Sequence, residues 1–453
     1  MALRKREEGG VQPGIKWWRF TTRIPGIHVG ISWPEVIQGG LLSAATGGAV
    51  APLMMRYFEL SFEVAWTVCF FQLFWIWMST MLFSEPYAPG WITPALPLVI
   101  VFLNGFTPGA EAVQAMTALT VCISLILLFF GITQLGGKFV NLVPVELRAG
   151  IIMGSAVAAF NSEFTRHATM PVTLTVVWAV VFLLLFSVWF GKMKAGSKTL
   201  TAIASMAMLI GFLVAAIVGP LAGEMKFNIS MGIYVPQFSA FLQAVSPFFV
   251  GWPSWDMYLK AMPLAAMIYI IVFGDLLVAD TLIKDAQRVR TDEKIIIDPI
   301  RTHFSLFFRN MGHLLTGGPF IPLHGPIWTG VAVFIIGRYK EGRKNLDSIY
   351  TGIINWYWLA FLLVLLAPVV SFMRPMLPVA LSITMILTGF ACAYIAMSMV
   401  NTPTGQGYAI FIGLLTAKFG PAYGLGVGIA LYFLLLLQKK QVIPITHDVK
   451  AKQ

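Results

Sequence analysis

Apolar residues fill the chain in long blocks, and short polar or charged stretches separate these blocks. Most blocks hold about 17–25 residues, the length that a helix needs to cross the hydrocarbon core of a bilayer. The mean hydropathy is +0.79, and only 11% of the residues are charged. The pattern predicts an all-α integral membrane protein with about fourteen spans. We place them at 34–56, 61–84, 88–106, 111–134, 138–161, 171–191, 198–222, 257–283, 301–317, 319–337, 346–372, 375–399, 406–419 and 421–438, with a long connection at 223–256.

One block should not form a regular helix. From residue 317 to 330 the sequence reads GGPFIPLHGPIWTG, which brings three glycines and three prolines by Pro326. Proline lacks a backbone donor and pushes the residue before it to extended geometry. We expect an extended segment over 319–323 and a helix that begins at Pro326. Half-helices of this kind commonly form the substrate site of transporters, and His324 and Gly325 stand here at the helix N-terminus.

A second interrupted block lies at 88–106. It contains Trp91, a predicted N-cap at Thr93 and a predicted first helical residue at Pro94. Two half-helices in corresponding places would meet near the middle of the membrane with their N-termini facing each other. Free N–H groups and the positive end of each helix dipole favour an anionic or carbonyl-rich ligand between them.

Two spacings predict an internal repeat. Pro326 follows Pro94 by 232 residues, and the motif VPVEL at 143–147 recurs as LPVAL at 377–381, 234 residues later. The near-equal spacings predict two halves of seven spans, and an odd number of spans inverts the second half in the membrane. The alternative is coincidence, because proline is frequent in membrane helices.

Basic residues gather in alternate connections, which predicts that both termini face the cytoplasm. The formal net charge of +11 is explained in this way and does not indicate a nucleic-acid partner. The expected cytoplasmic connections and the C-terminus carry Lys138, Lys192, Lys194, Lys198, Lys284, Arg288, Arg290, Lys294, Arg301, Arg338, Lys340, Arg343, Lys344, Lys439 and Lys440. The opposite connections carry few beyond Arg56, Arg166, Lys226, Lys260, Arg374 and Lys418.

Other sequence signals narrow the class of protein. The three cysteines lie inside apolar blocks, where cysteine serves mostly as small apolar filling. Residues 1–31 are basic without an apolar core or a cleavage site, so they do not form a signal peptide. The sequence shows no metal-ligand pair, Cys-x-x-Cys pair or phosphate-binding loop that would indicate a catalytic centre, a metal or a cofactor. We therefore expect neither an ATP-driven pump nor a membrane hydrolase.

The chain resembles the superfamily of nucleobase–cation symporters and SulP-type anion transporters over nearly all of residues 30–440. Residues 142–154 are similar to the fifth helix of that superfamily, and Phe273-Gly274-Asp275 is similar to the acidic site of its eighth helix. Residues 298–325 are similar to the ninth helix and the start of the broken tenth. Trp91 to Pro94 is also similar, more weakly, to the broken third helix of the benzoate-permease branch.

The resemblance implies a core domain, a gate domain and an elevator-like movement between them. The core would comprise 32–137 and 255–372, the gate 138–254 and 373–440, and the remaining segments 1–31 and 441–453 would be cytoplasmic. Two features depart from the family pattern. Nucleobase members carry glutamate where Asp275 and His324 stand here, and SulP members usually carry a soluble C-terminal domain, for which we see no counterpart after Leu437.

Asp275 is the main candidate for coupling transport to H⁺ or Na⁺, because no charged residue lies between Lys260 and it. The alternative is a carboxylate that packs helices together. His324, Gly325, Pro326, Trp91 and Thr93 are the candidate substrate-binding residues. His324 would donate to the substrate or titrate with transport, or else would satisfy backbone freed by the prolines.

Asn310 and His313 share one helical face and would support the site, with helix–helix hydrogen bonding as the alternative. We expect Arg309 to pair with a carboxylate of the core domain, either as part of the site or as a structural balance of charge.

Together these residues predict a secondary active transporter in the inner or plasma membrane that carries a small polar or anionic solute. A nucleobase-like substrate is our first interpretation. An inorganic anion or a carboxylate (sulfate-, bicarbonate- or benzoate-like) is the alternative, and a passive anion channel and a membrane enzyme are the rival classes. A homodimer is compatible with this reading.

Overall fold

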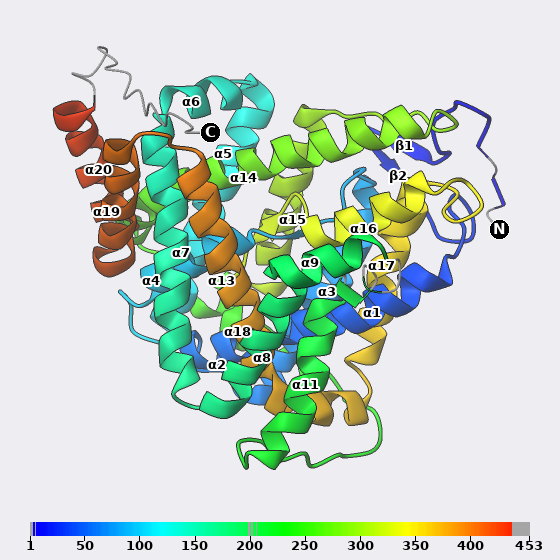
Figure 1. Ribbon diagram of the computed structural model, residues 1–453, viewed down its shortest axis with the longest axis horizontal. Helices are drawn as coiled ribbons and strands as arrows, with labels where there is room; N and C mark the ends of the chain where they lie inside the picture. The colour runs from blue at the N-terminus through cyan, green and yellow to red at the C-terminus, as the bar shows by residue number, and fades with distance from the viewer. Residues whose placement is uncertain (1–2, 5, 198–199, 201–202, 205, 437–453) are drawn as a thin grey trace, which may run out of the picture.

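The computed structural model of the chain describes residues 3–436 apart from 5, 198–199, 201–202 and 205, and within this part most residues are helical (Figure 1). The predicted tail at 441–453 lies outside the described residues. The elements of the first half are β1 (Ile15–Trp17), β2 (Phe20–Thr22), α1 (Trp33–Gly48), α2 (Ala51–Tyr57), α3 (Phe62–Phe83), β3 (Gly90–Trp91), a 3₁₀ turn (Thr93–Ala95), α4 (Leu96–Leu103), α5 (Ala110–Thr133), α6 (Gly136–Leu142), α7 (Val145–His167), α8 (Pro171–Phe186), α9 (Val188–Ala195) and α11 (Ala207–Leu221).

The second half begins with two short helices inside the predicted connection at 223–256. Its elements are α12 (Phe238–Val245), α13 (Pro247–Val250), α14 (Trp255–Val289), α15 (Pro299–Gly317), β4 (His324–Gly325), α16 (Thr329–Lys340), α17 (Ile349–Leu363), α18 (Ala367–Ser398), α19 (Pro403–Phe419) and α20 (Pro421–Leu435).

Apolar helices long enough to cross a membrane occur throughout the described part of the chain. By length and composition it has five such helices, counting Trp33–Tyr57 as one, and up to seven if each of two bent pairs is a single span. Shorter apolar helices, among them Thr93–Leu103 and Ile349–Leu363, complete the set. Short and broken spans therefore alternate with long ones, as the interrupted sequence blocks predict.

The helix packing repeats between the two halves. Helix α1 of the first half packs on α17 of the second half, and in the corresponding way α14 of the second half packs on α5 of the first. The pair α3–α17 is matched in the same way by α15–α5, and α8–α11 by α19–α20. Such an exchange of partners is the signature of two intertwined repeats. The predicted all-α fold with two inverted repeats and two broken spans is confirmed.

The helices form two groups by their contacts. One group joins α1, α3, α5, α14, α15 and α17, and the other joins α7, α8, α11, α18, α19 and α20. We call them the first and second packing groups. They correspond to the expected core and gate, but the division into two moving domains remains a prediction.

The predicted boundary between the spans 346–372 and 375–399 is wrong. Residues 373–374, where it was expected, lie inside α18 together with Pro375 and Pro378, and the chain turns earlier, at 364–366. Pro368 stands in the first turn of α18, where a missing N–H is harmless. The related Pro144 instead precedes α7, whose axis lies 93° from that of α6. The two copies of the proline motif therefore differ in structure, because Pro144 precedes a helix and Pro378 lies inside one.

The N-terminal segment is folded against the first packing group. β1 and β2 form an antiparallel hairpin, and Trp17 donates a hydrogen bond to the carbonyl of Leu82 at the end of α3. The buried Arg6 contacts the Asp292 carboxylate at 2.8 Å and the Asp347 carbonyl at 3.0 Å. The segment thus ties the α14–α15 connection to the α16–α17 connection on one side of the molecule. Which side of the membrane this is remains a prediction.

Candidate functional site

The two half-helices are preceded by strands that cross each other. β3 and β4 pair antiparallel, with Gly90 opposite Gly325 and Trp91 opposite His324. Two further backbone bonds extend the crossing, from the Ile92 N–H to the Leu323 carbonyl at 3.2 Å and from the Trp328 N–H to the Ala88 carbonyl at 2.8 Å. Pairing satisfies the backbone groups that the broken helices release, which a bilayer would otherwise leave without partners.

Both half-helices begin close to their predicted starts, but not at them. The helix expected from Pro326 begins at Thr329, because the residues up to Trp328 are still engaged in the crossing. Residues 321–322 form a turn instead of an extended segment, and Leu323 takes a φ of 56°. In the first half, Thr93 is the first residue of the 3₁₀ turn and Ile92 takes the N-cap position.

Side chains of α15 hold the free edge of β4. The Asn310 amide accepts from the His324 N–H at 2.8 Å and donates to the His324 carbonyl at 2.9 Å. Arg309 donates to the Gly325 carbonyl at 2.7 Å. Asn310 therefore imitates a neighbouring strand, and α15 fixes the position of the second half-helix. None of the carboxylates in the described part of the chain forms an ion pair with Arg309.

The segment before β3 is anchored in a similar way. Tyr357 of α17 donates to the Pro89 carbonyl at 2.5 Å, and Tyr87 donates to the Asp280 carboxylate of α14 at 2.5 Å. The Glu85 carboxylate accepts from Arg301 at 2.8 Å and from Thr302 at 2.9 Å. Both arms of the crossing are thus fixed to the first packing group.

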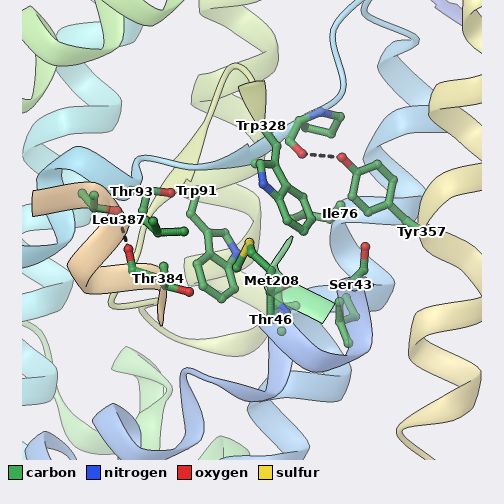
Figure 2. Close-up of a pocket in the computed structure, with 16 residues that line it drawn as sticks. Ser43, Thr46, Ile76, Trp91, Thr93, Met208, Trp328, Tyr357, Thr384 and Leu387 are labelled. Atoms are coloured by element: carbon green, nitrogen blue, oxygen red, sulfur yellow. Dashed lines mark hydrogen bonds between the residues drawn. The ribbon is translucent and has the colours of Figure 1, made fainter. Parts of the chain in front are cut away.

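A cavity of about 170 Å³ lies at the N-terminus of the first half-helix, between the two packing groups. Figure 2 shows Trp91 and Trp328 reaching into it from the two arms of the crossing, opposite Ser43 and Thr46 of α1. The lining residues are Ser43, Thr46, Gly47, Gln72, Leu73, Ile76, Pro89, Gly90, Trp91, Thr93, Met208, Trp328, Tyr357, Thr384, Leu387 and Thr388. No charged side chain is among them.

Several polar atoms at this cavity have no partner. Ser43 Oγ and both amide atoms of Gln72 are buried and make no hydrogen bond in the described part of the chain. A buried polar group without a partner costs free energy, so most such groups in proteins are satisfied. Unpartnered hydroxyl and amide groups that line a cavity are therefore suited to hold a polar ligand.

The predicted substrate-binding residues fall into two sets. Trp91 and Thr93 line the cavity, whereas His324, Gly325 and Pro326 do not. A Cβ at Gly325 would lie 2.9 Å from the Trp91 carbonyl, so the glycine makes room for the crossing. The role of each residue in binding remains a prediction.

The ring of His324 is fully enclosed by protein. It lies against Phe320 and His313, with ring centroids 5.1 Å away in each case, and neither ring nitrogen has a hydrogen-bond partner among the described residues. His313 donates a hydrogen bond through Nδ1 to the Gly318 carbonyl, 3.0 Å away. The carbonyl can only accept, so the proton is on Nδ1. These contacts place both histidines on the side of α15.

Asp275 lies apart from the cavity. It is half-buried on α14, and no described residue forms an ion pair or a hydrogen bond with it. Its helix, α14, also packs against α7 and α20 of the second packing group. The carboxylate therefore belongs to a helix that contacts both packing groups, and its coupling role remains a prediction.

Sequence reasoning missed several cavity residues, above all Ser43, Gln72 and Tyr357. One signal pointed to Gln72, because it is the single amide in the middle of the apolar run of α3. An amide inside a membrane helix needs a partner on another helix, a ligand or water. No group of three or more His, Cys, Asp or Glu side chains in the described part could hold a metal ion.

Comparison with known proteins reveals the fold but no near relative. No protein-family model matches the sequence, and no curated protein sequence matches it. Similar solved structures include SLC26A9, with a TM-score of 0.55 and 12% identity over 90% of this chain and 66% of that one. They also include the transmembrane domain of the cyanobacterial bicarbonate transporter BicA, with a TM-score of 0.52 and 14% identity over 88% of this chain and 99% of that one.

At these identities the likeness demonstrates a common fold. The chain spans less than two thirds of the SLC26A9 chain and nearly all of the BicA domain. The two neighbours support the fold that the resemblance implied, and they give no support to the nucleobase side of that resemblance.

Proposed function

We propose that the chain is a secondary active transporter that moves a monovalent anion across the membrane. The cavity at the start of the first half-helix supports this proposal most directly. It lies between the two packing groups, so a relative movement of the groups would expose it to either side in turn. Its unpartnered hydroxyl and amide groups and the positive end of the helix dipole suit an anion.

Two further observations favour an anion over a nucleobase-like solute. Arg309, which has no carboxylate partner among the described residues, places a positive charge beside the crossing. Because the protein interior has a low dielectric constant, this charge would attract an anion over a longer distance than it would in water. One structural neighbour is named as a bicarbonate transporter. The anion reading, the alternative in our sequence analysis, is therefore the one we adopt.

Asp275 would couple this transport to H⁺ or Na⁺. An ionisable group inside a membrane protein is costly, and its place on a helix that contacts both packing groups lets their movement change its access to water. Protonation or a bound sodium ion would neutralise the carboxylate and ease that movement. The proposal makes the protein a coupled transporter and not a passive channel.

Flux into proteoliposomes tests the proposal. We expect an imposed H⁺ or Na⁺ gradient to drive a labelled anion above its equilibrium level. Asp275→Asn should abolish the uphill accumulation and leave the protein folded, whereas Asp256→Asn, at an exposed ion pair with Lys260 on the same helix, should not. Downhill flux that no gradient can drive uphill would indicate a channel. Unchanged ion dependence in Asp275→Asn would refute the coupling role.

A further inference from the structure

The cavity is larger and more apolar than a small inorganic anion requires. A cavity of about 150 Å³ lined by apolar side chains can hold benzene, and this one measures about 170 Å³. Leu73, Ile76, Met208 and Leu387 supply aliphatic walls, and Trp91 and Trp328 supply rings. A halide or bicarbonate ion would leave most of these walls without contacts, and an unfilled wall forfeits its dispersion energy.

The buried polar groups of the lining that lack a partner lie on two neighbouring helices. Ser43 belongs to α1 and Gln72 to α3, two helices that pack together. Ser43 Oγ and the Gln72 amide nitrogen are buried donors without acceptors among the described residues, with 2% and 0% of the respective residues exposed. Two donors suit one carboxylate, which accepts through both oxygens.

The absence of charge in the lining also selects the ligand. No lysine, arginine or histidine lines the cavity in the described part of the chain, so a dianion would lose its hydration without a facing cation. A monoanion with its charge at one end loses less, and the apolar remainder of the molecule gains from burial.

We propose that the transported anion is an organic monocarboxylate with an apolar body about the size of one ring. The carboxylate would accept from Ser43 and Gln72, and the body would lie between Trp91, Trp328 and the aliphatic walls. This inference rests on the proposed function, which it narrows from anions in general to one class.

Benzoate and formate test the inference as a matched pair, because they carry the same carboxylate with and without a ring. We expect calorimetry on the purified full-length chain to show benzoate binding at least about tenfold more tightly than formate, since burial of a ring is worth more than one factor of ten. Sulfate should bind more weakly than benzoate. Equal affinities for benzoate and formate, or tighter binding of sulfate, would overturn the inference.

Two substitutions locate the binding in this cavity. Ile76→Trp should fill the apolar part and abolish benzoate binding while formate still binds, and Gln72→Leu should weaken both ligands about tenfold or more. Gln243→Leu on the exposed face of α12 is the control and should change neither affinity. Benzoate binding that survives both cavity substitutions would place the site elsewhere.

The outcomes separate this inference from the function on which it depends. Uphill transport of chloride or bicarbonate without benzoate binding would leave an anion transporter and refute the monocarboxylate. Binding of neutral benzamide or uracil at least as tight as that of benzoate would refute the need for a negative charge, and with it the anion transporter itself.

Discussion

The crossing of β3 and β4 has two different surroundings. On the side of α15, Asn310 and Arg309 form hydrogen bonds with the backbone of β4. On the cavity side, Ser43 and Gln72 are just as buried, yet their polar groups contact no described residue. The first arrangement holds the backbone in place. The second leaves polar groups without partners beside a cavity that a ligand can enter, as a binding site requires. The ring nitrogens of His324 also lack partners among the described residues, but they do not line the cavity.

This comparison changes what a polar residue in a membrane span indicates. The charged and titratable side chains of α15 are the conspicuous ones in the sequence, but their contacts fix the half-helix. The neutral side chains of α1 and α3 line the space that a ligand can enter. Substitutions on each side of the crossing should therefore change different properties, stability on one side and binding on the other.

The largest effect is expected for Gly325→Val. An added Cβ would meet backbone atoms of Trp91 and Ile92 at 2.9–3.0 Å, and backbone cannot move aside as a side chain can. We expect a loss of about 3 kcal/mol or more from overpacking, seen as a lower melting temperature and less monodisperse protein. Gly330→Val, where a Cβ would meet nothing within 4 Å, is the matched control. Normal stability in Gly325→Val would mean that the crossing is looser than it is drawn here.

The sequence was sufficient to predict the breaks and the repeat, because proline and glycine act locally. Three glycines and three prolines within the ten residues that end at Pro326 interrupt a helix, whereas a single proline can be absorbed by one. The sequence was not sufficient to predict the cavity. Whether Gln72 faces lipid, another helix or a hollow depends on where α1 and α18 lie, and no local rule contains that information. For the same reason Pro378 could be absorbed into α18 although its counterpart Pro144 precedes a helix.

Asn310→Leu should have the next largest effect on stability. Leucine has a similar size but leaves the His324 N–H and carbonyl without partners, at about 2 kcal/mol in total for these buried groups. The melting temperature of Asn310→Leu should fall. That of Thr316→Val, whose hydroxyl is exposed on the same helix, should remain unchanged. A melting temperature equal to that of the wild type would show that water or the strand itself replaces the amide.

Gln72→Leu should have the opposite signature. It removes two polar atoms that have no partners, so the ligand-free protein should gain about 1 kcal/mol of stability while its affinity for benzoate falls. A thermal-shift series with and without benzoate separates the two changes. If Gln72→Leu destabilises the ligand-free protein as Asn310→Leu does, the amide serves packing, and the contrast between the two sides of the crossing disappears.

Acid should loosen the connection into α15, with the smallest effect of the four. Asp292 lies in this connection, where hydrogen bonds from Arg290 and the charges of Arg290 and Arg6 lower the pKa of its carboxyl, and burial offsets this lowering only in part. A carboxyl whose pKa is lower in the folded state than in the unfolded state stabilises the fold. This stabilisation is complete above the unfolded-state pKa, near 4, and is lost as the pH falls through the folded-state pKa. The neighbouring Glu293 opposes this trend, because burial raises the pKa of its carboxyl.

The difference in melting temperature between the wild type and Asp292→Asn isolates this contribution from the rest of the acid response. It should be complete at pH 7 and shrink as the pH falls below about 4 and on through the folded-state pKa, because Asp292 then becomes neutral like the asparagine that replaces it. Asp256→Asn, which removes an exposed ion pair, should show little difference at either pH. A difference that persists unchanged into acid would mean that Asp292 acts through its shape and not its charge, and the N-terminal segment would then be anchored to the α14–α15 connection mainly by the backbone bonds of Gly9 and Lys294.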